Sequence, residues 1–209
     1  MPERLGRAFF ARDPVTLAQD LLGVVLVRVL DSGERLSGVI VETEAYLGVK
    51  DRAAHAFGGR RTARNESMYG QPGTAYVYFT YGMHHCVNVV CGGVDEPVAV
   101  LIRALEPREG LEAMAANRGR VRAPVVSLCS GPGKLCQAMA IDRELDGVDL
   151  PSDGRLFLEA GADGPINARA VRCGPRIGLG DVGVWASRRL RWWVGDSAHV
   201  SVRSGKSLR

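Results

Sequence analysis

The chain has 209 residues, 46% hydrophobic and 24% charged, which is ordinary for a globular protein long enough to bury a core. It shows no internal repeat and no linker, so we expect one domain over residues 1–209, with 1–4 and 203–209 frayed. No apolar run reaches the roughly 20 residues of a membrane span, and no signal-peptide pattern opens the chain. We therefore expect a cytoplasmic monomer that does not bind membranes.

The net charge of +4 is only mildly basic and is weak support for a nucleic-acid partner. Arginine supplies nearly all of the cations, which suits bidentate contacts with phosphate, although genomic base composition explains most of this bias. An odd number of cysteines without a CxxC pair argues against a disulfide framework or a structural zinc site. We expect these thiols to act as small buried hydrophobic groups: Cys86, Cys91, Cys129, Cys136 and Cys173.

In the first third of the chain the patterns predict a helix followed by a hairpin. Asp13-Pro14 is a good helix start, and Gly23 ends the apolar periodicity that follows it. Residues 24–30 and 35–42 resemble strands, and 31–34 has turn chemistry. If the second strand continues, Glu42 and Glu44 share one of its faces. Asp51 can then cap a short helix that carries His55.

The rest of the chain predicts a second hairpin and two more helices. Residues 74–81 and 84–90 form the hairpin, with Gly82-Met83 at its tip. Residues 98–105 form a strand that carries Arg103 in an otherwise apolar run. We expect Pro107 to open a helix that reaches residue 117, and residues 130–134 to start another helix. Short β-like runs and turns follow from residue 156.

Functional side chains gather between residues 42 and 88, where all five tyrosines and three of the four histidines lie. Glu44, set among Tyr46, Tyr78 and apolar strands, would be partly desolvated, which raises the pKa of a carboxylate towards that of a general base. His55 is its nearest polar partner in sequence, and the two could hold a water. The alternative is a surface glutamate at the end of a strand.

The aromatic side chains favour a pocket for a planar ligand. Enzymes that flip bases need flat side chains around the extruded base, and Tyr46, Tyr78 and His55 could supply them for a purine. Simple packing in strands is the alternative. Tyr81 and Met83 place apolar groups at a hairpin tip, which could wedge between base pairs or fold back on the core.

Two further sites are weaker. Asp51 and His55 lie near other acidic and histidine residues, but no pair has the spacing of a zinc site, so we expect no metal. The segment around Lys134 lacks the spacing of a P-loop. Its helix amides and Lys134 could hold one DNA phosphate, although a plain helix start is the alternative.

The sequence resembles the alkyladenine (3-methyladenine) DNA glycosylase family from Leu5 to about Val202. The matching blocks occur in the order of that family. They are Glu42-Thr43-Glu44-Ala45-Tyr46, Ala53-Ala54-His55, Tyr76-Val77-Tyr78, Tyr81-Gly82-Met83, Leu101-Ile102-Arg103 and Ser130-Gly131-Pro132. The resemblance implies a mixed α+β domain with a curved, mostly antiparallel sheet, surrounding helices and a protruding hairpin.

The resemblance also implies a monofunctional enzyme that removes alkylated purines from double-stranded DNA without a cofactor or catalytic metal. It matches Glu44 to the general base that activates water, and it matches Asn88 to the residue that disfavours the exocyclic amine of guanine. The other matched positions have three roles. They are Tyr46, His55 and Tyr78 around the base, Tyr81 and Met83 for intercalation, and Arg103 for a backbone phosphate.

Three segments depart from the family pattern, and two other functions stay open. His84 and His85 stand where aromatic rings are expected, Trp192-Trp193 replaces smaller aromatic residues, and residues 118–126 match poorly. A non-catalytic reader of damaged DNA would keep the wedge and the pocket, but it would have no need of both Glu44 and His55. A metal-dependent hydrolase would lose its activity with a chelator.

Overall fold

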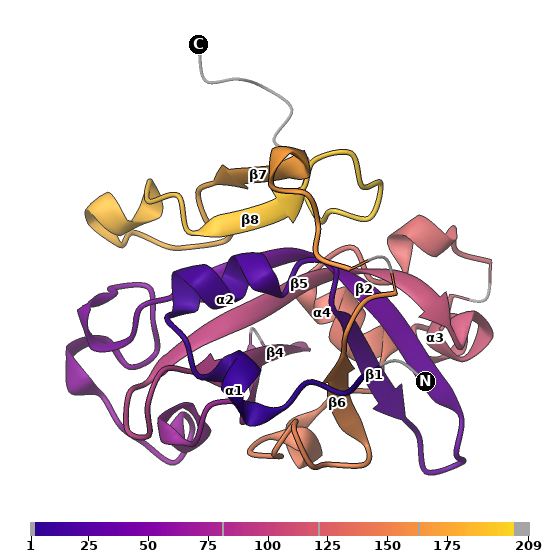
Figure 1. Cartoon of the computed structure of the whole chain (residues 1–209), viewed down its shortest axis with the longest axis horizontal. Helices are drawn as coiled ribbons and strands as arrows, with labels where there is room; N and C mark the ends of the chain where they lie inside the picture. Colours follow the sequence, from indigo (N-terminus) through magenta and orange to yellow (C-terminus); the bar gives the residue numbers. More distant parts are fainter. Residues whose placement is uncertain (1–2, 81, 121, 163, 203–209) are drawn as a thin grey trace.

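The computed structural model describes residues 3–80, 82–120, 122–162 and 164–202. Within these ranges eight strands form one antiparallel sheet in the order β3-β4-β5-β2-β1-β6, and β8 joins it at β2 and pairs with β7 (Figure 1). The protein is a single α+β domain with a curled sheet, which confirms the predicted fold class. The strands are β1 (Val25–Val29), β2 (Arg35–Tyr46), β3 (Ala75–Thr80), β4 (His84–Cys91), β5 (Val98–Glu109), β6 (Leu156–Glu159), β7 (Val171–Gly174) and β8 (Arg191–Val194).

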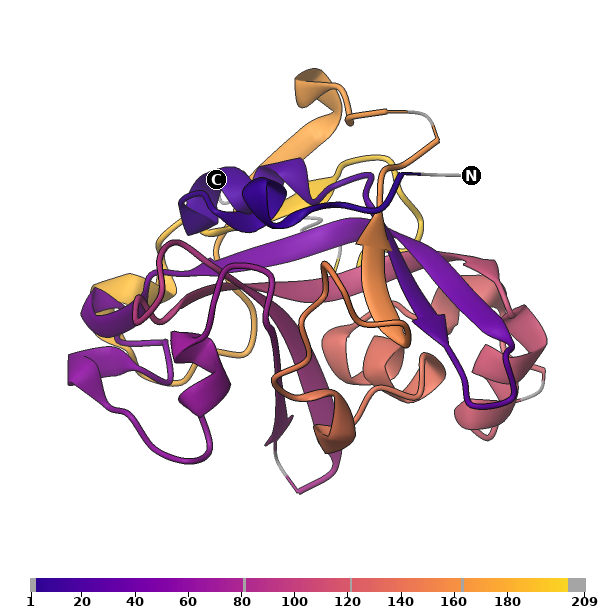
Figure 2. The ribbon, with the colours of Figure 1, turned by 60° about the horizontal axis from the view of Figure 1, so that its bottom comes forward.

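Short helices cover both sides of the long central strands β2 and β5. Figure 2 shows α2 on one side of these strands and α4 on the other. The α-helices of the described residues are α1 (Arg7–Phe10), α2 (Pro14–Asp20), α3 (Leu111–Asn117) and α4 (Pro132–Ala138). Their 3-10 helices are η1 (Gly48–Lys50), η2 (Phe57–Gly59), η3 (Glu66–Tyr69), η4 (Val125–Ser127), η5 (Arg143–Leu145), η6 (Ala168–Ala170) and η7 (Gly183–Ala186).

The start of α2 and both predicted hairpins are confirmed. The Asp13 carboxylate accepts hydrogen bonds from the amides of Val15 and Thr16, and Pro14 occupies the first turn, as the sequence predicts. The strands β1 and β2 form the first hairpin, and β3 and β4 form the second. Gly82 at the tip of the second hairpin has a φ of 66°, which a residue without a side chain adopts at little cost.

Alternation along β2 sends neighbouring side chains to opposite sides of the sheet. The Thr43 hydroxyl donates to the carbonyl of Ala18 in α2 at 2.6 Å and so ties that helix to the strand. Glu42 and Glu44 both reach Arg103 on the other side, although bulges interrupt the pairing of β2 with β5 around these residues. The prediction that the two carboxylates share a face is confirmed.

Two predicted helix starts are wrong. Pro107 lies inside β5, opposite Gly38 at an irregular point of the ladder, where a missing amide is tolerated. The helix α3 begins only at Leu111, after Gly110 turns the chain with a φ of 72°. Asp51 does not cap an α-helix, because residues 51–56 form turns and its carboxylate is bound to other groups.

Other details extend or confirm the predictions. The helix α1 was not expected, and the bridge between Arg4 and Glu159 holds a residue that we expected to fray. Four of the five cysteines are buried as predicted, and Cys173 is half-buried. None of the described helices is long and apolar enough to cross a membrane.

Candidate active site

A pocket of about 650 Å³ opens beside the β3–β4 hairpin, between the loop at residues 52–65, the start of α4 and the segment at residues 177–182. This volume lies within the range of sites that enclose a small organic ligand such as a nucleoside. The structure brings most of the predicted site residues to its walls. They are Tyr46, His55, Tyr78, Asn88 and Arg103.

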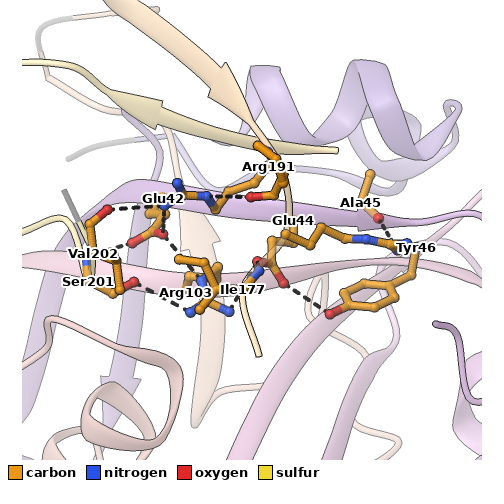
Figure 3. Close-up of polar contacts among 11 residues, drawn as sticks. Glu42, Glu44, Ala45, Tyr46, Arg103, Ile177, Arg191, Ser201 and Val202 are labelled. Carbon is orange, nitrogen blue, oxygen red and sulfur yellow. Dashed lines mark hydrogen bonds and ion pairs between the residues drawn. The ribbon is translucent and has the colours of Figure 1, made fainter. Parts of the chain in front are cut away.

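Glu44 is fully buried, and Figure 3 shows its polar contacts with residues that line the pocket. Its Oε1 accepts a hydrogen bond from the Ile177 amide at 2.7 Å, and its Oε2 accepts one from the Tyr46 hydroxyl at 3.0 Å. The guanidinium of Arg103 is 3.2 Å from Oε1. Burial raises the pKa of Glu44, and the Arg103 charge and the two hydrogen bonds partly oppose that rise. The expected desolvated carboxylate is therefore present.

Tyr46 links Glu44 to the pocket. Burial and the neighbouring Glu44 charge raise the pKa of its hydroxyl well above the ordinary value, so Tyr46 stays protonated and donates to the carboxylate. The guanidinium of Arg176 lies over the Tyr46 ring, 4.6 Å from its centroid. Since Tyr46 also lines the pocket, this ring is supported by a buried cation while it contributes to the wall.

A second buried carboxylate, Glu42, shares Arg103 with Glu44. Its Oε1 lies 3.2 Å from Arg103 Nε and 2.9 Å from Arg191 Nη1, and its Oε2 accepts from the Ser201 amide at 2.7 Å. Only 7% of the Arg103 side chain is exposed, and two carboxylates already bind its guanidinium. Its contact with a DNA phosphate stays a prediction.

His55 is oriented by a tyrosine, not by Glu44. Its Nδ1 lies 2.6 Å from the Tyr76 hydroxyl, and its ring meets Tyr78 edge-on, with centroids 4.6 Å apart and planes at 83°. His55 and Tyr78 therefore meet at a corner of the pocket instead of forming parallel walls. Partial desolvation, together with the charges of Arg64 and Arg60, lowers the pKa of His55, so the ring is neutral at pH 7.

Asn88 is a fixed part of the pocket wall. It is buried on β4, and its Nδ2 donates to the Tyr76 carbonyl at 2.9 Å. This bond holds the plane of the amide, so the side chain presents a defined shape to the pocket. Its effect on guanine stays a prediction.

At the tip of the β3–β4 hairpin, the side chain of Met83 points outward. Tyr81 lies outside the described residues, and Met83 is 70% exposed, so Met83 does not fold back on the core. His85 packs on Phe79 with ring centroids 4.9 Å apart, and so takes the place of the aromatic ring expected there. The intercalating role of the tip stays a prediction.

Lys134 is exposed in the first turn of α4, where its Nζ lies 3.4 Å from Ser130 Oγ. The neighbouring Pro132 and Gly133 line the pocket, which places this turn at its edge. A phosphate contact by Lys134 stays a prediction.

Sequence reasoning missed Arg176 and Ile177. Arg176 pairs with Asp51, and Ile177 donates to Glu44, yet both stand in a turn-rich stretch without a motif. Only the Pro and Gly residues that flank them signalled a special backbone there. Among the described residues no cluster of His, Cys, Asp and Glu could hold a metal ion: Asp51 binds Arg176, and His55 binds Tyr76.

The comparisons of this chain with a family model and with individual proteins agree with one another. The family model described as "Methylpurine-DNA glycosylase (MPG)" matches residues 8–198. The DNA-3-methyladenine glycosylases of Mus musculus and Homo sapiens are 49% and 48% identical over 95% of this chain, which spans 61% and 68% of their lengths. A putative 3-methyladenine DNA glycosylase of Desulfitobacterium hafniense is 44% identical over 96% of this chain and 100% of its own length.

The α+β fold and the buried glutamate behind an aromatic pocket, taken with these matches, class the chain with the DNA glycosylases, which are hydrolases. It belongs to the methylpurine-DNA glycosylase family.

Proposed function

We propose that the protein removes alkylated purines from double-stranded DNA by hydrolysis of the N-glycosidic bond, with Glu44 as the general base. The observation that carries this proposal is the position of Glu44. The carboxylate is fully buried, and the three residues that bind it, Tyr46, Arg103 and Ile177, all line the pocket. In the proposed mechanism this carboxylate acts on a water bound at the pocket wall.

In the proposed reaction, water attacks C1′ of the deoxyribose and gives a proton to the Glu44 carboxylate. The C1′–N bond breaks, and its electron pair leaves with the base. A purine alkylated at N3 or N7 carries a positive charge, so this electron pair neutralises the leaving group. The negative charge of Glu44 also stabilises the oxocarbenium character that develops on the sugar. The products are a free base and an abasic site.

The pocket is suited to a flipped purine. Tyr46 and Tyr78 supply aromatic surface, and Asn88 limits the space beside the base. If Tyr76 donates to His55 Nδ1, the other ring nitrogen carries the proton and can donate to an acceptor on the base. Damaged bases that pair or stack weakly leave the helix at lower cost, which adds to the selectivity.

Contacts with the duplex would come from the rim. Arg52, Arg60 and Arg64 line the pocket and are exposed, so they can meet the phosphates that flank a flipped nucleotide. Met83, together with Tyr81 beside it in sequence, would fill the gap in the base stack.

The experiment that tests this function measures base release in EDTA from duplexes that each carry one lesion. The set comprises 3-methyladenine, 7-methylguanine, ethenoadenine and hypoxanthine, with an undamaged duplex as the control. We expect a free base and an alkali-sensitive abasic site from at least one alkylated purine. Tight binding of a lesion without base release would favour the non-catalytic reader, and activity that disappears in EDTA would favour a metal-dependent hydrolase.

A further inference from the structure

The structure contains a buried ion pair, Asp51 with Arg176, that does not line the pocket. Both side chains are fully buried. Arg176 Nη1 lies 2.5 Å from Asp51 Oδ2, and Nη2 lies 2.8 Å from Oδ1, so the contact is bidentate. A buried ion pair gains little net stability over apolar packing, because both charges lose their hydration. A contribution to the stability of the fold therefore does not by itself account for this pair.

The Asp51 side of the pair holds the chain after β2. Its Oδ2 accepts from the Leu47 amide at 3.1 Å, and its Oδ1 accepts from the Ala53 amide at 3.0 Å. One carboxylate thus fixes both ends of the turn that leads from β2 towards His55.

The Arg176 side holds the two groups that donate hydrogen bonds to Glu44. Its Nη1 donates to the Ala45 carbonyl at 3.0 Å, and its guanidinium lies over the Tyr46 ring. The next residue is Ile177, whose amide donates to Glu44 Oε1, while the Tyr46 hydroxyl donates to Oε2. The positions of both donors therefore depend on the position of the Arg176 side chain.

We propose that the Asp51–Arg176 ion pair is a positioning device that holds the Tyr46 hydroxyl and the Ile177 amide on the general base. Asp51 and Arg176 act as positioning residues and do not touch the substrate. This role rests on the proposed function of Glu44. It predicts that loss of the pair slows the chemical step and leaves lesion binding largely intact.

The pH profile separates this role from simple support of the fold. Both hydrogen bonds favour ionised Glu44, so their loss raises the pKa of that carboxyl, and the acid limb of the rate profile moves to higher pH. Besides Tyr46, whose hydroxyl is one of the two donors, several titratable or charged groups lie around Glu44, and none of them is substituted in the variants. They are Glu42 of β2, Tyr78 of β3, Cys86 of β4, Arg103 of β5 and Arg191 of β8.

The test uses Asp51→Asn and Arg176→Lys in the full chain. A lysine keeps the positive charge, but its single ammonium group cannot form a bidentate pair with Asp51 and also cover the Tyr46 ring. Arg176→Lys therefore tests the geometry of the ion pair without removing its charge. We expect the single-turnover rate of base release to fall about 10- to 100-fold in Asp51→Asn, less in Arg176→Lys, with the affinity for the lesion duplex changed less than about threefold. The acid limb should move to higher pH in both variants.

A matched control is Glu159→Gln, which breaks another bidentate pair, between Glu159 and Arg35, away from the pocket. It should lower the melting temperature without moving the pH profile. Rates and a pH profile equal to wild type in Arg176→Lys and Asp51→Asn would overturn the positioning role.

The result for Glu44→Gln, measured in parallel, keeps the two proposals apart. If Glu44→Gln loses base release while the pair variants keep it, only the positioning role fails. If Glu44→Gln keeps base release, the general base is wrong and the positioning role falls with it.

Discussion

Two glutamates two residues apart on β2 have different surroundings although both are fully buried. Glu42 binds two arginines and a backbone amide, so its charge is balanced within the protein. Glu44 shares Arg103 and adds one tyrosine and one amide, and burial still raises its pKa. The difference suits Glu42 to structure and Glu44 to proton transfer.

Arg103 should set the pH range in which Glu44 works. In the proposed mechanism Glu44 acts in its ionised form, and the Arg103 charge holds its pKa below the value that burial alone would give. We expect Arg103→Gln to raise that pKa, so the acid limb of the single-turnover profile moves to higher pH. Arg12→Gln, which breaks a pair with Asp20, is the control and should leave the profile unchanged. A shift to lower pH would contradict this role.

Glu42 should matter for stability. Glu42→Gln removes a carboxylate that serves both Arg103 and Arg191, and breaking such a buried pair costs about 3–5 kcal/mol. Urea unfolding would measure the change. Glu109→Gln, which alters an exposed pair with Arg35, should cost no more than about 1 kcal/mol. Equal losses of unfolding free energy in the two variants would show that the buried pairs of Glu42 stabilise the fold no more than the exposed pair of Glu109.

At the scale of elements, the sequence predicted the features that depend on residues close together in the chain. The two hairpins and the start of α2 follow from turn residues, caps and alternation, and all three are confirmed. Pro107 misled the prediction, because an irregular ladder tolerates a proline that normally opens a helix or ends a strand. Asp51 misled it as well, because its partner Arg176 lies 125 residues away.

The tip of the β3–β4 hairpin should act in DNA binding and not in folding. Met83 is 70% exposed, so Met83→Ala should change the free energy of unfolding by less than about 0.5 kcal/mol. It should still weaken binding to a lesion duplex, because less apolar surface enters the base stack. Val94→Ala, at another exposed apolar residue, should leave that affinity unchanged. Unaltered affinity in Met83→Ala would argue against insertion of this side chain.

At the scale of the molecule, the candidate site is assembled from distant parts of the chain. Glu44 and Tyr46 come from β2, Tyr78 and Asn88 from the hairpin, and Ile177 from the segment after β7. The family resemblance alone places the first four in one site. It could not supply the hydrogen bonds, because the Ile177 amide donor is a backbone group that no side-chain pattern marks.

Association with DNA should depend on salt, since cations surround the pocket. If Lys134 contacts a phosphate, Lys134→Ala should weaken binding to damaged and undamaged duplexes alike. It should also reduce the slope of log K against log salt by about 1. Lys50→Ala removes another exposed lysine as the matched control. A slope that is the same in Lys134→Ala and wild type would remove Lys134 from the interface.

The most direct test of the proposed mechanism is the single-turnover rate of base release by wild type and Glu44→Gln on one alkylated duplex in EDTA. Binding of the same duplex is measured in parallel. Glutamine preserves the shape of the side chain but cannot take a proton from water. We predict that Glu44→Gln binds the lesion as wild type does and releases no base. Release at the wild-type rate would contradict the role of Glu44 as the general base.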